Sequence, residues 1–313
     1  MQVCSTAARM RSCGANFSFP IPFVQLNPAQ QIAVEHIDSP LLVLAGAGSG
    51  KTRVITEKLA HLVTRGFKSD ELLAITFTNK AAREMRERAV SRLRERADAL
   101  TISTFHALGL RVLQAEARFA GLRPGFSVLD ADESLKTLKE LAPSGLSADS
   151  VQWLRHTISQ LKSAGYRPDE ALALANGPRE RQAAELYAAY QKRLTAYNAV
   201  DFDDLIRLPL AMLEQDETVR DRWQRRYRYV LIDEYQDTNG SQYRLLKALT
   251  GERGAFTAVG DDDQSIYAWR GADPENLRRL GEDYPTLHVV KLEQNYRCAG
   301  RILRAANAVI GRN

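Results

Sequence analysis

An apolar stretch that leads directly into a glycine-rich turn constrains the fold of this chain more than any other feature. Residues 41–45 predict a buried strand, and the sequence Gly-Ala-Gly-Ser-Gly-Lys-Thr follows at 46–52. Glycines let backbone N–H groups converge on a phosphate, Lys51 adds a mobile positive charge, and the Thr52 hydroxyl can bind Mg²⁺. The helix expected to begin near Lys51 adds the positive end of its dipole. The pattern predicts a nucleotide triphosphate cradle; the alternative is a glycine-rich turn without ligand.

Strand-like apolar runs alternate with helix-length segments in two separate blocks, as expected of a parallel sheet covered by helices on both faces. The predicted strands are 41–45, 72–77 and 100–103 in the first block and 229–232, 256–259 and 287–292 in the second. Between the blocks strands vanish, and the apolar residues are spaced as on helices. We therefore expect an α/β core formed by 24–106 and 200–292, interrupted by an all-helical insertion at 107–199.

Two groups of residues that could touch nucleic acid are interpreted as structural. Tyr187, Tyr190 and Tyr197 lie at helical spacing, which is more typical of packing than of base stacking. The arginine-rich stretch 83–96 is interleaved with glutamates, which favours a solvated helix face over a DNA-binding patch.

Composition limits the class of protein without identifying it. The formal charge of +5 suits a polyanionic partner but is weak evidence alone. The three cysteines, Cys4, Cys13 and Cys298, have neither metal-ligand nor disulfide spacing, so a reducing, cytoplasmic setting is expected. No apolar run approaches the length needed to cross a membrane, and residues 1–23 are predicted to be a disordered extension.

A second segment places paired acids after a fully apolar strand. Residues 229–232 are followed by Asp233 and Glu234. Ligands of parallel sheets bind at the carboxyl edge of the strands, so Asp233 could hold Mg²⁺ while Glu234 orients and deprotonates an attacking water. An acidic turn after a buried strand is the alternative.

The segment 258–271 combines an amide, aromatic side chains and an arginine after another apolar strand. Gln264 could touch the γ-phosphate, and Tyr267, Trp269 and Arg270 offer stacking faces and positive charge to a single nucleic-acid strand. A tryptophan in such a loop is more often a packing residue, so this interpretation depends on the other motifs.

The order of these motifs resembles that of superfamily 1 helicases of the UvrD, Rep and PcrA type, from Leu26 to the end of the chain. This family also begins its phosphate loop with alanine, as Ala45 does here. The matching segments are 26–30, 45–53, 76–80, 104–106, 233–236, 260–270 and 294–297.

The resemblance implies a role for each matching residue. Gln30 would read the adenine edge, Arg53 and Tyr296 would surround the base, and Arg297 would stabilise transition-state charge. The implied ATP site comprises these residues and Ala45, Gly46, Ala47, Gly48, Ser49, Gly50, Lys51 and Thr52. The implied catalytic residues are Lys51, Asp233, Glu234, Gln264 and Arg297, with Mg²⁺ on Thr52 and Asp233. The implied DNA contacts are Phe77, Thr78, Asn79, His106, Tyr267, Trp269 and Arg270, although a lone histidine such as His106 is more often structural.

The activity implied by the resemblance is 3′ to 5′ translocation on single-stranded DNA, driven by ATP hydrolysis in a RecA-like core. Its substrates would be single-stranded and tailed or forked duplex DNA in a bacterial cytoplasm, at the nucleoid. Replication or repair proteins are candidate partners, and a monomer or weak dimer is expected. Because the family's fifth and sixth motifs do not occur before Asn313, residues 293–313 are interpreted as the start of a truncated second core. The alternative is an ATP-gated DNA-binding or regulatory module without motor activity.

Overall fold

The computed structural model describes residues 25–267, 272–273 and 275–311. Its centre is a six-stranded parallel sheet with the strand order β3-β2-β6-β7-β1-β8. The strands are β1 Leu41–Ala45, β2 Leu72–Thr76, β3 Thr101–Thr104, β6 Tyr229–Ile232, β7 Phe256–Gly260 and β8 His288–Leu292. The predicted α/β fold is confirmed, and each strand end lies within about one residue of the prediction, because buried apolar runs are a strong signal.

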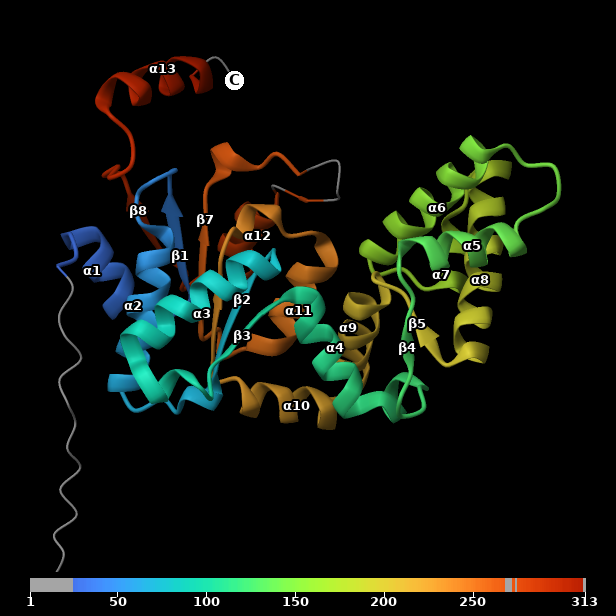
Figure 1. The fold of residues 1–313 in the computed structure, drawn as a ribbon, viewed down its shortest axis with the longest axis horizontal. Helices are drawn as coiled ribbons and strands as arrows, with labels where there is room; N and C mark the ends of the chain where they lie inside the picture. Colours follow the sequence, from blue (N-terminus) through green and yellow to red (C-terminus); the bar gives the residue numbers. More distant parts are fainter. Residues whose placement is uncertain (1–24, 268–271, 274, 312–313) are drawn as a thin grey trace, which may run out of the picture.

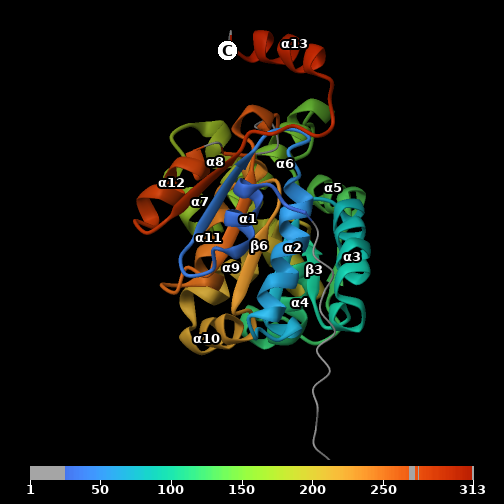
Figure 2. The ribbon, with the colours of Figure 1, turned by 90° about the vertical axis from the view of Figure 1, so that its left-hand side faces the viewer.

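Helices cover both faces of the sheet, as Figures 1 and 2 show. One face is packed by α1 Pro28–Glu35, α2 Lys51–Thr64 and α3 Asn79–Leu93. The other is packed by α4 Phe105–Glu116, α9 Asp204–Gln215, α10 Glu217–Arg226, α11 Gly240–Thr250 and α12 Glu275–Asp283. The inner strands β1, β2 and β6 are buried on both sides, which explains their nearly continuous apolar sequences, whereas the edge strand β8 exposes His288, Val289 and Lys291.

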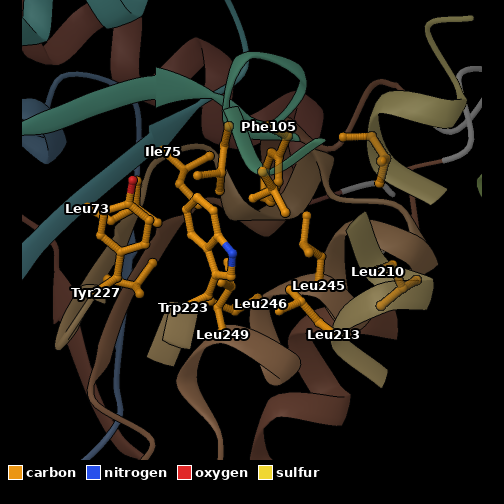
Figure 3. Close-up of a cluster of buried hydrophobic side chains, with 14 of the residues drawn as sticks. Leu73, Ile75, Phe105, Leu210, Leu213, Trp223, Tyr227, Leu245, Leu246 and Leu249 are labelled. Carbon is orange, nitrogen blue, oxygen red and sulfur yellow. The ribbon is translucent and has the colours of Figure 1, made fainter. Parts of the chain in front are cut away.

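Trp223 lies in the middle of the larger apolar core (Figure 3). It is 3% exposed, and it packs in one cluster with Ile75 of β2, Leu210 of α9 and Leu246 of α11. Its indole N–H donates a 3.2 Å hydrogen bond to Oε1 of Glu116, so the polar edge of the ring is satisfied within the core. The core thereby holds three helices against the sheet.

A separate group of helices lies to one side of the sheet (Figure 1). It comprises α5 Ala131–Leu141, α6 Ala148–Ser163, α7 Pro168–Leu174 and α8 Pro178–Tyr197, which share an apolar cluster of their own. Tyr187 and Tyr190 are buried in that cluster, which confirms their interpretation as packing residues. Tyr197 is 56% exposed and accepts a hydrogen bond from Arg193 on the helix surface, so its interpretation as a packing residue is wrong.

The region expected to be helical contains two short strands. Residues Ser127–Val128 (β4) and Ala199–Val200 (β5) pair in parallel, so the expectation that no strand occurs there is wrong. Two-residue strands are too short to show alternation in a sequence. Helix α4, which lay largely inside the expected insertion, packs in the core cluster with α9 and not with α5–α8. The exact division into domains stays a prediction.

The exposed face of α3 agrees with the sequence pattern, and α13, Gly300–Ile310, also exposes apolar side chains. Helix α3 buries Met85, Ala89 and Leu93 and leaves most of its charged residues toward solvent. Helix α13 exposes Ile302 by 60% and Val309 by 71%. Among the helices of the described residues, none is long and apolar enough to span a membrane.

Candidate nucleotide site and the adjoining cavity

The turn after β1 adopts a conformation that requires glycine at two positions. Gly48 and Gly50 have φ angles of +76° and +97°, in the left-handed region. A Cβ atom on Gly48 would lie 2.6 Å from Cβ of Arg297, and one on Gly50 would lie 2.6 Å from Nε2 of Gln30. Ser49 Oγ donates a 2.7 Å hydrogen bond to the Gly46 carbonyl. The loop is therefore a tight cradle that neighbouring segments approach closely.

The side chain of Gln30 ties helix α1 to this cradle. It is 1% exposed, its Nε2 donates to the Ser49 carbonyl at 2.9 Å, and its Oε1 accepts from the Asn27 N–H at 3.2 Å. Arg53, on the first turn of α2, donates from Nη2 to the Gln25 carbonyl at 2.7 Å. Both residues lie beside the cradle as expected, and their contact with a base stays a prediction.

The segment that follows β8 crosses over the cradle. The Tyr296 N–H donates to the Gly48 carbonyl at 2.9 Å, and Asn295 Nδ2 donates to the Ala47 carbonyl. Asn295 Oδ1 accepts from the N–H groups of Arg297 and Cys298, both at 2.8 Å. Asn295 thus fixes the turn that carries Tyr296 and Arg297, whose side chains are exposed.

A cavity of about 540 Å³ opens in front of the cradle. Its lining includes the cradle residues Ala45, Gly46, Ala47 and Ser49 together with Asp261, Gln264, Asn295 and, from α13, Leu303 and Ile310. The carboxyl ends of β1 and β7 and the segment after β8 therefore face one shared space.

Polar side chains from three neighbouring strand ends form a closed group beside Lys51. We call Lys51, Glu234, Gln236, Asp261 and Gln264 the polar ring. Lys51 Nζ lies 3.6 Å from Glu234 Oε2 and 3.9 Å from Asp261 Oδ2. Gln236 donates from Nε2 to Glu234 Oε2 at 2.9 Å and accepts from the Asp261 N–H at 3.0 Å, while Gln264 Nε2 donates to Asp261 Oδ2. The adjacent positions of β6, β7 and β1 bring these groups together.

The electrostatics of the site suit a phosphate and a divalent cation. Burial, followed by repulsion from Glu234, raises the pKa of Asp233 to about 7. The Lys51 ammonium is buried and has no hydrogen-bond partner among the residues described. A phosphate would give Lys51 acceptors, and a cation would favour the charged form of Asp233. Thr52 lies directly after Lys51 at the beginning of α2.

A second cavity, of about 290 Å³, brings together several expected DNA contacts. Phe77, Thr78, His106 and Tyr267 line it, together with Ser159, Ser163, Asp203 and Asp237. Thr78 Oγ1 also caps α3 by accepting from the Ala81 N–H at 3.1 Å, and Asn79 is the first residue of that helix. Burial lowers the pKa of His106, so its ring is neutral at pH 7. Trp269 and Arg270 lie outside the described residues.

Comparison with known proteins identifies the family. The model of the UvrD/REP helicase N-terminal domain matches residues 26–285. The chain belongs to this family. It is 53% identical over 294 residues to the ATP-dependent DNA helicase Rep of Escherichia coli, covering 93% of this chain and 44% of Rep. It is 44% identical to PcrA of Bacillus subtilis and 45% identical to UvrD1 of Mycobacterium tuberculosis, in each case over 92% of this chain. These alignments cover 40% and 39% of the two relatives, so the chain spans less than half the length of each.

The resemblance to the UvrD, Rep and PcrA helicases is thereby confirmed, while the roles of individual residues stay predictions. Sequence reasoning assigned no role to Gln236, Asp261 or Asn295, although each joins the site in this UvrD/REP domain. Asp261 directly follows an apolar strand, which is the signal that had singled out Asp233. The roles of Gln236 and Asn295 depend on contacts between segments far apart in the chain.

Proposed function

We propose that this chain forms the ATP-binding part of an ATP-dependent DNA helicase that moves 3′ to 5′ along single-stranded DNA. The supporting observation is that the polar ring is connected to both cavities: Asp261 and Gln264 of the ring line the first cavity, and short segments of chain lead from the ring to the second. Glu234 belongs to the ring, and Asp237, three residues later, lines the second cavity; Gln264 belongs to the ring, and Tyr267 lines that cavity. A rearrangement of the polar ring when it binds a γ-phosphate would therefore move the side chains proposed to face DNA, through the short segments 234–237 and 264–267.

Lys51, Glu234 and Gln264 of the ring and several neighbouring residues have a chemical task in this proposal. Lys51 pairs with the β- and γ-phosphates once they replace its present carboxylate neighbours. Glu234 orients the attacking water and accepts its proton, and Arg297 and Gln264 contact the γ-phosphate. Thr52 and Asp233 would hold Mg²⁺, which neutralises charge on the phosphates when bound. On the base side, Gln30, Arg53 and Tyr296 would surround the adenine.

The second cavity is the proposed site for single-stranded DNA. Phe77, His106 and Tyr267 offer aromatic faces, on which bases stack independently of sequence. The DNA substrates would be single strands and tailed or forked duplexes, in the cytoplasm. Replication or repair proteins are the proposed partners of a monomer or weak dimer.

The decisive experiment measures ATP binding, hydrolysis and strand separation in the full-length protein. Lys51→Ala should lose tight ATP binding, whereas Glu234→Gln should bind ATP and hydrolyse it slowly. The exposed Glu252→Gln is the matched control and should behave as wild type. ATP-dependent separation of a 3′-tailed duplex by wild type supports a motor. ATP-dependent DNA affinity without strand separation would instead establish the ATP-gated binding module.

A further inference from the structure

A cluster of buried charges lies where the helices α5–α8 meet the six-stranded sheet with its covering helices, which we call the sheet domain. Lys162 Nζ, on α6, lies 2.7 Å from Asp201 Oδ2 and 3.1 Å from Asp204 Oδ2. Arg207 Nη2 lies 2.9 Å from the other oxygen of Asp204. The side chains of Lys162 and Asp204 are completely buried. We call these four residues the junction cluster.

The junction cluster connects helices that belong to different apolar cores. Helix α6 contributes to the core of the helical group, and α9, which carries Asp204 and Arg207, contributes to the core around Trp223. Helix α8 takes part as well, since the Lys162 ammonium lies 5.1 Å from the ring centroid of Tyr190. The junction cluster therefore connects the two apolar cores through polar contacts.

The hydrogen bonding of the cluster is nearly saturated. Asp201 Oδ1 accepts from the Asp204 N–H at 2.9 Å, and Gln191 Nε2 of α8 donates to Asp204 Oδ2 at 3.3 Å. Burial opposes the ionisation of Asp204, but Lys162 and Arg207 outweigh it and hold its pKa at about 2. The cluster is thus charged at neutral pH and depends on exact pairing, because a buried charge without its partner is strongly unfavourable.

Such a cluster restricts the orientation of α6 more narrowly than apolar packing does. Apolar burial is non-directional, whereas hydrogen bonds weaken steeply when distances or angles change. The Lys162 ammonium of α6 pairs with Asp204, the first residue of α9, and with Asp201, three residues before that helix, so a rotation or shift of α6 would break at least one of these bonds.

The same stretch of α6 forms a wall of the second cavity. Ser159 and Ser163, which flank Lys162 in sequence, line that cavity together with Phe77 and His106 of the sheet domain. Asp203 and Ile206, from the beginning of α9, also line it. The position of α6 against α9 therefore determines how far this wall lies from the aromatic side chains.

We propose that Lys162 is a positioning residue for single-stranded DNA, because its pairing with Asp201 and Asp204 fixes α6 and so sets the width of the second cavity. The inference rests on the proposed DNA site. Lys162 itself does not line the cavity among the residues described, and it acts through the placement of Ser159 and Ser163.

The test compares Lys162→Met with a control that breaks another buried ion pair. In Glu116→Gln the altered carboxylate is 3% exposed and is held by Arg222 and Trp223, within the sheet domain. Both variants should lower the thermal midpoint. At a temperature where both are folded, Lys162→Met should bind a fluorescent oligodeoxythymidylate about tenfold more weakly, comparable to the loss of one stacked base. Glu116→Gln should retain wild-type DNA affinity, and both variants should retain wild-type ATP affinity.

A distance measurement distinguishes positioning from general destabilisation. Spin labels at the exposed positions Gln160 on α6 and Glu84 on α3, with the native cysteines replaced by serine, report the position of α6 relative to the sheet domain. We expect one narrow distance distribution in wild type and Glu116→Gln, and a shifted or broadened one in Lys162→Met. Should Lys162→Met fail to fold, Asp201→Asn provides the same comparison, because it leaves Lys162 paired with Asp204.

The outcomes separate this inference from the proposed function. If Lys162→Met and Glu116→Gln bind DNA equally well and give the same distance distribution, Lys162 has no positioning role. If Phe77→Ala leaves the DNA affinity of the wild-type background unchanged, the cavity is not the DNA site. In that case the proposed role of Lys162 in DNA binding is overturned as well. The distance distributions then show only whether Lys162 fixes the position of α6.

Discussion

Replacing Gln236 by methionine should slow ATP hydrolysis while leaving ATP binding almost unchanged. The side chain is 2% exposed, and its amide joins Glu234 to the backbone of Asp261. Methionine has a similar length but cannot donate to a carboxylate or accept from an N–H group. The variant would free the Glu234 carboxylate and leave the Asp261 N–H unsatisfied, without altering the cradle.

The magnitude follows from the bond to Glu234. A hydrogen bond to a charged group contributes about 1.5 to 3 kcal/mol. If that whole contribution orients Glu234 in the transition state, its loss lowers kcat by about 10- to 100-fold. The KM for ATP should change by less than about threefold, since Lys51 and the cradle glycines are untouched.

Steady-state ATP hydrolysis in the absence of DNA is the assay, and Gln242→Met is the matched control. Gln242 is 5% exposed and its amide oxygen caps α11 by accepting from the Asn239 N–H, without contacting the polar ring. Because Gln242 also lines the second cavity, DNA is left out of this comparison. Both variants should lose a similar amount of stability in urea denaturation. A Gln236→Met protein with the kcat of Gln242→Met would refute the reasoning that Gln236 orients Glu234.

Three further predictions concern the metal, the cradle and the core. Lowering the pH from 8 to 6 should weaken Mg²⁺-dependent ATP binding by about tenfold, because Asp233 takes up a proton below its pKa of about 7; Asp233→Asn should abolish this dependence in fluorescence titrations. Asn295→Ala should raise the Kd for ATP by about tenfold, because the Ala47 carbonyl and two N–H groups lose their partner; unchanged calorimetric titrations would contradict this. Gly109→Ala should lower the free energy of unfolding by about 3 kcal/mol, since its Cβ would lie 1.7 Å from the Leu205 carbonyl oxygen. Gly66→Ala, at φ +97° with open space around it in the described part of the chain, should lose only about 1 kcal/mol in the same urea titration.

The sequence was sufficient for the sheet and for the cradle because both depend on local patterns. The inner strands β1, β2 and β6 are nearly continuous apolar runs, and the glycines, Lys51 and Thr52 of the loop at 46–52 have the spacing that phosphate binding requires. The placement of Asp233 and Glu234 near Lys51 followed from a general property of parallel sheets.

The remaining parts of the site depend on contacts that no local pattern specifies. Asp261 meets Lys51 because β7 lies between β6 and β1, an order that the sequence alone does not reveal. The close contact of Gly109 with Leu205 holds α4 on the core, although its apolar spacing is equally compatible with a place in the helical group. Asn295 reaches the cradle from a segment almost 250 residues away.

The short pair formed by β4 and β5 brings the entry and the exit of the helical group side by side. Ser127 donates to the Asn198 carbonyl at 3.1 Å, and Leu129 donates to the Val200 carbonyl at 2.8 Å. The segment between β4 and β5 therefore starts and ends at the same place on the sheet domain, so its length can change without changing the course of the chain through the sheet. Evolution could lengthen, shorten or replace such an insertion without changing the connections between the strands of the sheet. A protein engineer could likewise bridge Val128 and Ala199 with a short glycine-rich linker and recover the sheet domain as a smaller folding unit.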